Sequence, residues 1–428
     1  MTPKIDLYIH GTSEMITCVP RQDDTVGRIE DGAIAISDGR IVAVGKRSQL
    51  EGELDLSTAM RIDARGRILA PGFVDCHTHL VFGRSRVKEY ALKMTMTSAE
   101  IEASGLKTGI PASIEMTREE GEDALFNSAL DRLNRMIRYG TTTVESKSGY
   151  GIRLDDELKQ LRVNKRLNTV SPIEVISTFL GGHDFPPEID RTDPIARNDY
   201  IRELTEEMIP RVAKEGLAEF CDIYCDTGYY TVEESETILR SGITHGLLPR
   251  IHTDAYANIG GSSLAAALPA VSADHLNYTS RKEMTLLAEA GVVGVVLPAL
   301  DFAVKHPDPF NARPMLDAGM TLALGTNLNP GNWTESMQIV MQFACRNHGM
   351  SLEEAMLAAT TGAARAVNRS TSIGRLAAGY QADLQLWDLP CFEDIIYRTG
   401  NNAVVLVMKN GKIAVDLEQV TDLADRKQ

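Results

Sequence analysis

The chain has 428 residues and a net charge of −15, from 44 basic and 59 acidic side chains. This acidic balance argues against binding to nucleic acid or to an anionic membrane surface, so we expect a small-molecule substrate. No stretch approaches the roughly 20 apolar residues that span a bilayer, and the first residues lack a secretory pattern, so the expected location is the cytoplasm.

Both ends of the chain show the alternation of apolar and polar residues that is typical of short β-strands. The runs "KIDLYIH" and "AIAISDGRIVAVGK" lie near the start, and "ADLQLWDL" and "AVVLVMKNGKIAV" lie near the end. The "DG" and "NG" dipeptides within them indicate hairpin turns. We therefore predict a small composite β-sandwich domain of antiparallel strands, built from residues 1–68 and 369–428.

Between these ends, residues 69–368 alternate short apolar runs with segments that carry apolar residues at helical spacing. Several helical segments end at a glycine, such as "DALFNSALDRLNRMIRYG" and "RKEMTLLAEAG". Eight such units predict the α/β class, as a (β/α)8 TIM-type barrel with its active site at the carboxyl ends of the strands. The apolar runs are "ILAPGFVDCHTHL", "GTTTVESKSGYG", "IEVISTFLGGH", "FCDIYCDTGYY", "LLPRIHTDAY", "AVSADHLN", "GVVGVVLPAL" and "TLALGTNLNPG".

Five of the nine histidines lie where these predicted strands end. His77 and His79 are two residues apart, a spacing that puts both imidazoles on one face of an extended strand. His183, His252 and His275 end the third, fifth and sixth runs. Each alone would more often be a buried core histidine, but together they indicate a metal site. Three imidazoles around one ion leave an open position for water, which predicts hydrolysis or deamination.

The cysteines are few and scattered, without the density of a disulfide scaffold. Cys221 and Cys225 in "CDIYC" are separated by three residues within a strand-like run. We expect buried core cysteines there, with a zinc or redox pair as the alternative.

The run "PGFVDCHTHL", the flanking sheet segments and "AGYQADLQLWD" resemble the amidohydrolase superfamily. Within it, the chain is similar to the imidazolonepropionase family, which opens imidazolone propionate in histidine breakdown. The resemblance covers nearly the whole chain and implies a homodimer. The motifs that carry it are "HLVFGRSR" (79–86), "TTTVESKSGYG" (141–151), "ELKQLRV" (157–163), "TFLGGHDFPPE" (178–188), "SADHLNYTS" (272–280) and "NPG" (329–331).

The resemblance implies a role for each matching residue. His77, His79 and His252 match the ligands of one divalent metal ion, zinc or iron. His275 matches the histidine that positions or activates the attacking water.

The resemblance also implies how the substrate is held. Arg86 and Tyr150 match the groups that hold the carboxylate and the ring, and His183 matches a histidine that contacts the ring carbonyl. A guanidinium and a phenol suit a small acidic ring, because the first anchors a carboxylate and the second donates to the ring.

The chain departs from the family pattern at three positions. Asn327 stands where the family has the strand-eight aspartate that touches the metal and takes a proton from water. A neutral amide cannot be that base, although its oxygen remains a weak candidate ligand. Ala255 replaces a glutamate that contacts substrate and water, and Ala99 replaces a tyrosine that binds the carboxylate.

Two acidic residues stand where the family usually has apolar ones. Asp184 follows His183, and Asp301 in "LPALDF" ends the predicted seventh strand. Our hypothesis is that one of them replaces the lost base or recognises a different ring substituent. The alternative is that each is a solvated loop acid.

The sequence therefore predicts a metal-dependent hydrolase that opens a five-membered cyclic amide or ureide with a carboxylate arm. Imidazolone propionate and a hydantoin or thiohydantoin analogue are the candidate substrates. A non-catalytic binding homologue that kept the histidine cluster is the alternative. A third reading is that Asn327 was introduced to trap a substrate.

Overall fold

The computed structural model describes residues 4–417, and its largest element is the predicted barrel. Eight parallel strands follow one another in chain order from β8 to β15. They are almost entirely buried, which is typical of parallel sheets. The strands are β8 (Phe73–Asp75), β9 (Thr141–Lys147), β10 (Glu174–Gly182), β11 (Phe220–Cys225), β12 (Leu248–Thr253), β13 (Ser272–His275), β14 (Val293–Val296) and β15 (Leu322–Leu324).

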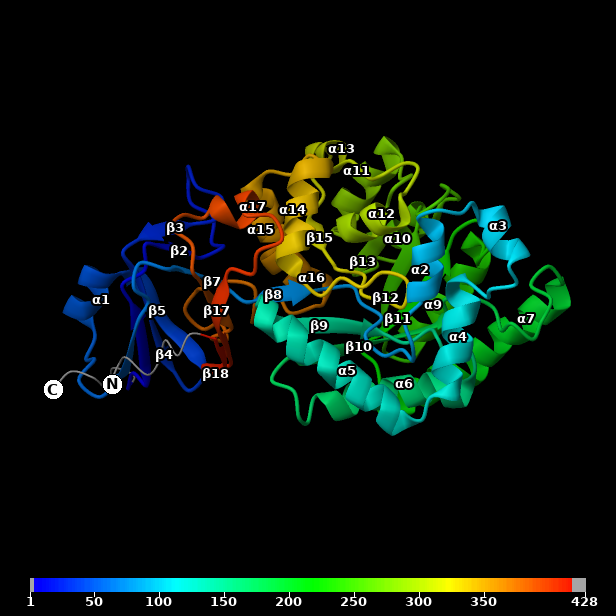
Figure 1. Ribbon diagram of the computed structural model, residues 1–428, viewed down its shortest axis with the longest axis horizontal. Coiled ribbons are helices and arrows are strands. Elements are labelled where there is room, and N and C mark those ends of the chain that lie inside the picture. The colour runs from blue at the N-terminus through cyan, green and yellow to red at the C-terminus, as the bar shows by residue number, and fades with distance from the viewer. Residues whose placement is uncertain (1–3, 418–428) are drawn as a thin grey trace.

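Helices alternate with these strands and cover the outside of the barrel (Figure 1). Local signals set their ends: the side chains of Thr231 and Ser280 cap the starts of α9 and α11, and Gly291 ends α11 with a positive φ of 73°. In residues 4–417 no helix is long and apolar enough to cross a membrane. The helical segments around the barrel are α5 (Glu122–Met136), η1 (Ile137–Tyr139), α6 (Leu154–Leu167), α7 (Pro194–Glu203), η2 (Leu204–Met208), α8 (Ile209–Glu215), α9 (Val232–Thr244), α10 (Gly261–Ala267), α11 (Arg281–Ala290), α12 (Pro298–Val304), α13 (Ala312–Asp317), α14 (Met337–Asn347), α15 (Leu352–Leu357), η3 (Ala358–Gly362) and α16 (Ala363–Ala366).

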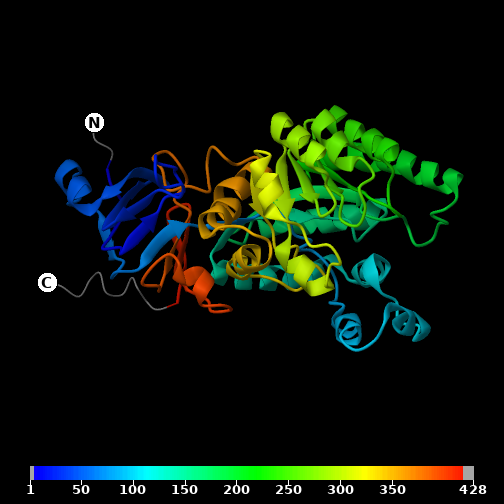
Figure 2. The ribbon, with the colours of Figure 1, turned by 90° about the horizontal axis from the view of Figure 1, so that it is seen from above.

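Three more helices follow β8 within the first strand–helix connection. They are α2 (Val87–Lys93), α3 (Ser98–Ala103) and α4 (Gly109–Glu119). Drawn in cyan, they project from one side of the barrel (Figure 2). This long insertion supplies α2, which lines the cavity described below.

Two sheets lie beside the barrel (Figure 1), and the six-stranded one combines strands from both ends of the chain, whereas the four-stranded one is built from residues 7–63. The predicted sandwich is present, but the expectation of antiparallel strands throughout is wrong. Strand β1 pairs with β6, and β2 with β7, in parallel, because chain connections bring together strands that no hairpin joins. The four-stranded sheet is β5 (Arg40–Lys46), β4 (Gly32–Ser37), β1 (Leu7–His10) and β6 (Met60–Asp63), with α1 (Arg47–Glu53) after β5; the six-stranded sheet is β18 (Lys412–Asp416), β17 (Val404–Lys409), β16 (Leu384–Trp387), β7 (Ile68–Pro71), β2 (Glu14–Ile16) and β3 (Arg28–Glu30), with α17 (Asp394–Tyr397) between β16 and β17.

Aromatic packing joins the six-stranded sheet to the barrel. Phe73 on β8 stacks on Trp387 of β16, with ring centroids 5.9 Å apart, and both side chains are fully buried. Strand β7 begins at Ile68, so it spans the predicted boundary between residues 68 and 69. The domain boundaries stay predictions.

Strands β8 and β15, the two ends of the barrel sheet, are joined through Asp75. Its Oδ1 accepts the backbone N–H of Thr326 at 3.0 Å, and its Oδ2 accepts the Thr326 hydroxyl at 2.6 Å. Just beyond, the N–H of Asn327 donates to the carbonyl of His77 at 2.9 Å. These bonds hold the end of β15 against the histidine pair.

Cys221 and Cys225 both lie on β11, and their side chains are buried and free of disulfides. Burial raises the pKa of Cys225 to about 11 and also raises the pKa of Cys221. Both are therefore neutral thiols near pH 7, which fits core cysteines better than a zinc or redox pair.

Candidate metal centre and substrate cavity

Three histidines converge at the carboxyl end of the barrel. His77 and His79 follow β8, and His252 lies on β12, with one ring nitrogen of each within 4.8 Å of the others. In the described residues, Nε2 of His77, Nε2 of His252 and Nδ1 of His79 are buried and have no hydrogen-bond partner. Three such nitrogens fit a divalent metal ion. The predicted ligands come together, although His77 and His79 follow the strand instead of lying in it.

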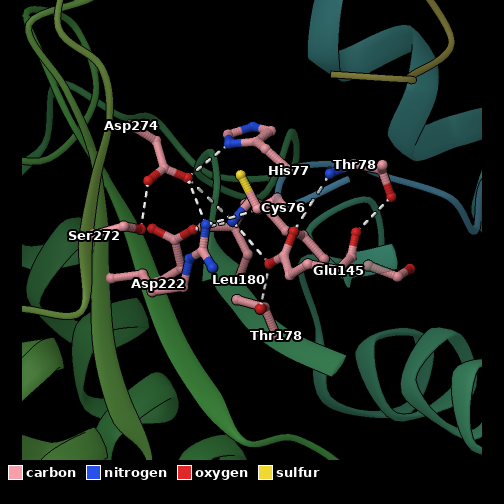
Figure 3. A network of polar contacts seen from close by, with 12 residues as sticks. Cys76, His77, Thr78, Glu145, Thr178, Leu180, Asp222, Ser272 and Asp274 are labelled. Atoms are coloured by element: carbon pink, nitrogen blue, oxygen red, sulfur yellow. Dashed lines mark hydrogen bonds and ion pairs between the residues drawn. The ribbon is translucent and has the colours of Figure 1, made fainter. Parts of the chain in front are cut away.

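Two carboxylates orient the imidazoles of His77 and His252. Nδ1 of His77 lies 2.6 Å from Oδ2 of Asp274, and Nδ1 of His252 lies 3.1 Å from Oδ1 of Asp222. Because a carboxylate accepts, each Nδ1 carries the hydrogen and each Nε2 keeps its lone pair for a metal. Figure 3 shows Asp274 between His77 and Ser272, whose hydroxyl donates to Oδ1 of Asp274 at 2.6 Å.

A buried ionic network, made of Glu145, Lys147, Asp222, Arg250 and Asp274, holds these carboxylates. Nζ of Lys147 lies 2.8 Å from Asp222, 2.9 Å from Glu145 and 3.5 Å from Asp274. Arg250 lies 3.0 Å from Asp274. Burial alone would lower the pKa of Lys147, but the three carboxylates raise it above its usual value, so the ammonium stays charged.

His77, His79, His183 and His275 are neutral imidazoles near pH 7. Burial is the main cause that lowers the pKa of His77, His79 and His275 well below 6.5, and it lowers the pKa of His183 to about 3. Only the neutral imidazole binds a metal, so His77 and His79 are in the form that binding requires.

A cavity of about 250 Å³ opens on this cluster. Besides His79 and His252, its wall brings together five residues that the sequence singled out: Arg86, Tyr150, His183, His275 and Asn327. Burial raises the pKa of Tyr150 above 10, so its phenol is a hydrogen-bond donor near neutral pH.

Arg86 forms a charged cluster with Glu89 and Lys93 in this cavity. Glu89, which is buried, lies 3.3 Å from Arg86 and 2.5 Å from Lys93 on the same helix, and it accepts the N–H of Gly109 at 3.0 Å. Burial would raise the pKa of Glu89, but the two cations and the hydrogen bonds lower it. Two cations against one carboxylate leave one net positive charge, which suits an anionic group of a substrate.

Because Gly331 has no side chain, the guanidinium of Arg86 can lie close to the backbone there. A Cβ at this glycine would lie 2.0 Å from a terminal nitrogen of Arg86. Since that nitrogen ends a flexible side chain, a Gly331→Ala variant should fold and displace the guanidinium. We expect about a tenfold weaker affinity for a carboxylate-bearing substrate, measured by calorimetry. Gly121→Ala, where a Cβ meets open space, is the matched control, and equal affinity in both variants would contradict this role.

Asn327 and His183 present opposite hydrogen-bonding groups to the cavity. Nδ2 of Asn329 donates to Oδ1 of Asn327 at 3.2 Å, so the Asn327 amide group is assigned with its Nδ2 as the free donor. Nδ1 of His183 donates to the carbonyl of Gly149 at 3.0 Å, which leaves Nε2 of the neutral ring as an acceptor.

Asp301 is not at the end of a strand, and the predicted placement is wrong. Strand β14 ends at Val296, and Asp301 lies on α12, outside the residues that line the cavity. Its carboxylate oxygens lie 3.1 Å from Nδ2 of Asn277, and one accepts the N–H of Phe310 at 3.2 Å. The apolar run "GVVGVVLPAL" contains a strand end and a helix start, which letters alone do not separate.

Asp301→Asn should therefore lower the free energy of unfolding by about 1–3 kcal/mol, since it weakens buried hydrogen bonds to a carboxylate. We expect turnover per folded molecule to stay within about twofold, because the side chain does not line the cavity. Urea unfolding and initial rates measure the two effects, with exposed Asp308→Asn as control. A large loss of rate at unchanged stability would restore the catalytic hypothesis.

Asp184 is buried rather than solvated, so the alternative of a solvated loop acid is wrong for it. It forms an ion pair with Arg191 and accepts the N–H of Phe185 at 2.8 Å. It does not line the cavity.

Ala255 is buried and donates its N–H to Asp226 at 2.8 Å, and Ala99 is exposed on α3.

The sequence-based prediction missed the supporting residues. Charged residues in otherwise apolar strand runs, such as Lys147 and Asp222, are unusual in buried strands and would have indicated a polar network. Glu89 lies three residues after Arg86 and four before Lys93, a spacing that helix geometry brings to one face. Both signals were in the sequence.

Comparisons with known proteins identify the family of the chain. The amidohydrolase family matches residues 200–414. The imidazolonepropionase of Shouchella clausii is 41% identical over 423 residues, which cover 96% of this chain and 93% of that protein, and the imidazolonepropionase of Geobacillus thermodenitrificans is 42% identical over 397 residues, 91% of each.

Solved structures share the fold at lower identity. An adenosine deaminase from Xanthomonas campestris with bound zinc has a TM-score of 0.72 at 20% identity, covering 97% of this chain and 94% of that one. Atrazine chlorohydrolase from Arthrobacter aurescens with zinc has a TM-score of 0.66 at 19% identity, covering 98% and 99%. The chain belongs to the amidohydrolase family, beside its imidazolonepropionases, and is a hydrolase of carbon–nitrogen bonds.

Proposed function

We propose that this protein opens a five-membered cyclic amide or ureide that carries a carboxylate arm. Imidazolone propionate and a hydantoin or thiohydantoin propionate are the candidate substrates. The observation that carries the proposal is the cluster of three buried imidazoles with nitrogens that have no partner; two of them, His79 and His252, line a cavity that also contains Arg86. Membership of an enzyme family favours hydrolysis over a role in binding alone.

His77, His79 and His252 would hold one divalent ion, zinc or iron. Such an ion lowers the pKa of bound water towards 7 and polarises a carbonyl oxygen. His275 lines the cavity as a neutral imidazole, so it can take a proton from the attacking water and return it to the ring nitrogen that leaves.

The other cavity residues bind and orient the ring. Arg86 and Lys93 hold the carboxylate arm, and the Tyr150 hydroxyl donates to the ring. The free donor of Asn327 and the free acceptor of His183 suit a carbonyl and an N–H of one amide or ureide. This assigns His183 to a ring N–H, not to the carbonyl contact expected from the family. A homodimer also stays a prediction, which light scattering checks.

The test is a panel of imidazolone, hydantoin and thiohydantoin propionates, with ring-opened products measured by mass spectrometry. We expect turnover of at least one compound, reduced about a thousandfold or more by His252→Ala. His245→Ala, an exposed histidine, is the matched control. If the protein with bound metal turns over no member, or if His252→Ala has no effect, the proposal is wrong.

A further inference from the structure

A second cavity, of about 610 Å³, adjoins the catalytic one and has mainly apolar walls. We call it the outer cavity; Val87, Phe302, Trp333, Ile339 and Phe343 belong to its wall. Three of these large side chains are strongly exposed: Val87 at 64%, Phe302 at 60% and Trp333 at 48%. Large apolar side chains gathered on one surface usually mark a binding site.

The two cavities adjoin and share part of their walls. Tyr90, Ala303 and Gly331 line both of them. Gly331 also lies against the guanidinium of Arg86. The proposed carboxylate anchor is therefore at the junction, and a substrate held by Arg86 has one side towards the histidines and another towards the outer cavity.

Contacts with neighbouring side chains support the apolar walls. Phe302 on α12 stacks on Phe343 of α14, with ring centroids 4.7 Å apart. Trp333 packs edge-on against Phe82 at 5.5 Å, and its indole N–H donates to Glu335 at 3.1 Å. Aromatic walls held in this way suit a flat or branched apolar group.

Size also favours a ligand that reaches both cavities. The catalytic cavity, at about 250 Å³, is below the range of roughly 300–1,000 Å³ that is usual for pockets of small organic ligands. The outer cavity lies within that range. The outer cavity is concave and adjoins a polar site, which is typical of a pocket for a small molecule. A surface that binds another protein is usually flatter.

We infer that the outer cavity binds an apolar group of the substrate, about the size of a phenyl ring, attached to the part of the molecule that bears the carboxylate held by Arg86. This inference rests on the proposed function, because it assigns a further part of the same substrate. It narrows the substrate class to cyclic amides with both an anionic and an apolar substituent.

The test measures binding of two probes, butyrate and 4-phenylbutyrate, to the parent protein. Both carry the carboxylate, and only the second carries the apolar group. The chain has two tryptophans, and Trp387 is fully buried, so a ligand in the outer cavity changes chiefly the emission of Trp333. We expect 4-phenylbutyrate to bind at least about tenfold more tightly than butyrate and to change that emission.

A variant at the junction tests the continuity. Ala303→Phe narrows the passage, so it should abolish the tenfold preference, measured by calorimetry, whereas the exposed Ala103→Phe should keep it. Equal affinity of the two probes for the parent protein would overturn the inference. So would a preference that survives Ala303→Phe, or Trp333 emission that neither probe changes.

Neither probe is hydrolysed, so the two proposals can fail separately. A clear phenyl preference without turnover of any cyclic amide would keep the outer-cavity inference and remove the proposed function. Turnover of the cyclic amides without a phenyl preference would keep the function and remove the inference.

Discussion

An Asn327→Asp variant is expected to hydrolyse imidazolone propionate faster than the parent protein, by about two to four orders of magnitude. The reason is that a carboxylate accepts a proton from water and neutralises part of the charge of a divalent ion, whereas an amide does neither. The position can accommodate the change, because Nδ2 of Asn329 already donates to Oδ1 of Asn327 and would donate equally to an aspartate. The backbone N–H bond to His77 is independent of the side chain.

The measurement is kcat/KM at saturating metal for the parent, Asn327→Asp and the exposed control Asn401→Asp. A gain confined to Asn327→Asp would show that the amide limits the family reaction here, as it would if Asn327 had been introduced to trap a substrate. An unchanged or lower rate, with metal retained, would show instead that the amide donor matches a different ring.

Lys147→Met should be the most damaging single change to the metal centre. It removes the ammonium that lies within 3.5 Å of Asp222, Glu145 and Asp274, and it leaves Arg250 as the cation of the buried ionic network. Removing one partner of a buried ion pair costs about 3–5 kcal/mol in the free energy of unfolding. The carboxylates that orient His77 and His252 would also shift, with a loss of about 10–100-fold in metal affinity.

Urea unfolding and metal titration measure these two effects, with the exposed Lys282→Met as the matched control. If Lys147→Met does not fold, Lys147→Arg, which keeps the charge, separates the loss of charge from the loss of shape. A stable Lys147→Met protein with unchanged metal affinity would show that the network does not hold the histidines.

Local patterns predicted the barrel and the histidine cluster because both depend on short segments. Strand β14 is an apolar run between Gly291 and Pro298, His77 and His79 follow β8, and His252 lies next to the last residue of β12. The parallel pairs β1–β6 and β2–β7 join segments that are not adjacent in the chain, so hairpin signals could not reveal them. The same limit hid the contacts of Lys147 with Asp222 and Asp274, which come from three different strands.

Residue placement failed where one run of letters contained two elements. The apolar run before Asp301 contains both the end of β14 and the start of α12. The pattern therefore predicts a strand-end residue where the structure has a helical one. Side-chain orientation was equally out of reach, because only the structure shows that Asn329 holds the oxygen of Asn327. The contacts that Asp301 and Asn327 make in the folded protein, and not their residue types alone, decide their roles.

The most direct test of the account is the metal content per chain of protein purified without added metal, measured by plasma mass spectrometry. The three buried imidazoles, two of them with carboxylate partners, predict about one zinc or iron per chain, lost in His79→Ala and kept in the exposed control His245→Ala. Folded protein that contains no metal, and takes up none on titration with zinc or iron, would contradict the account.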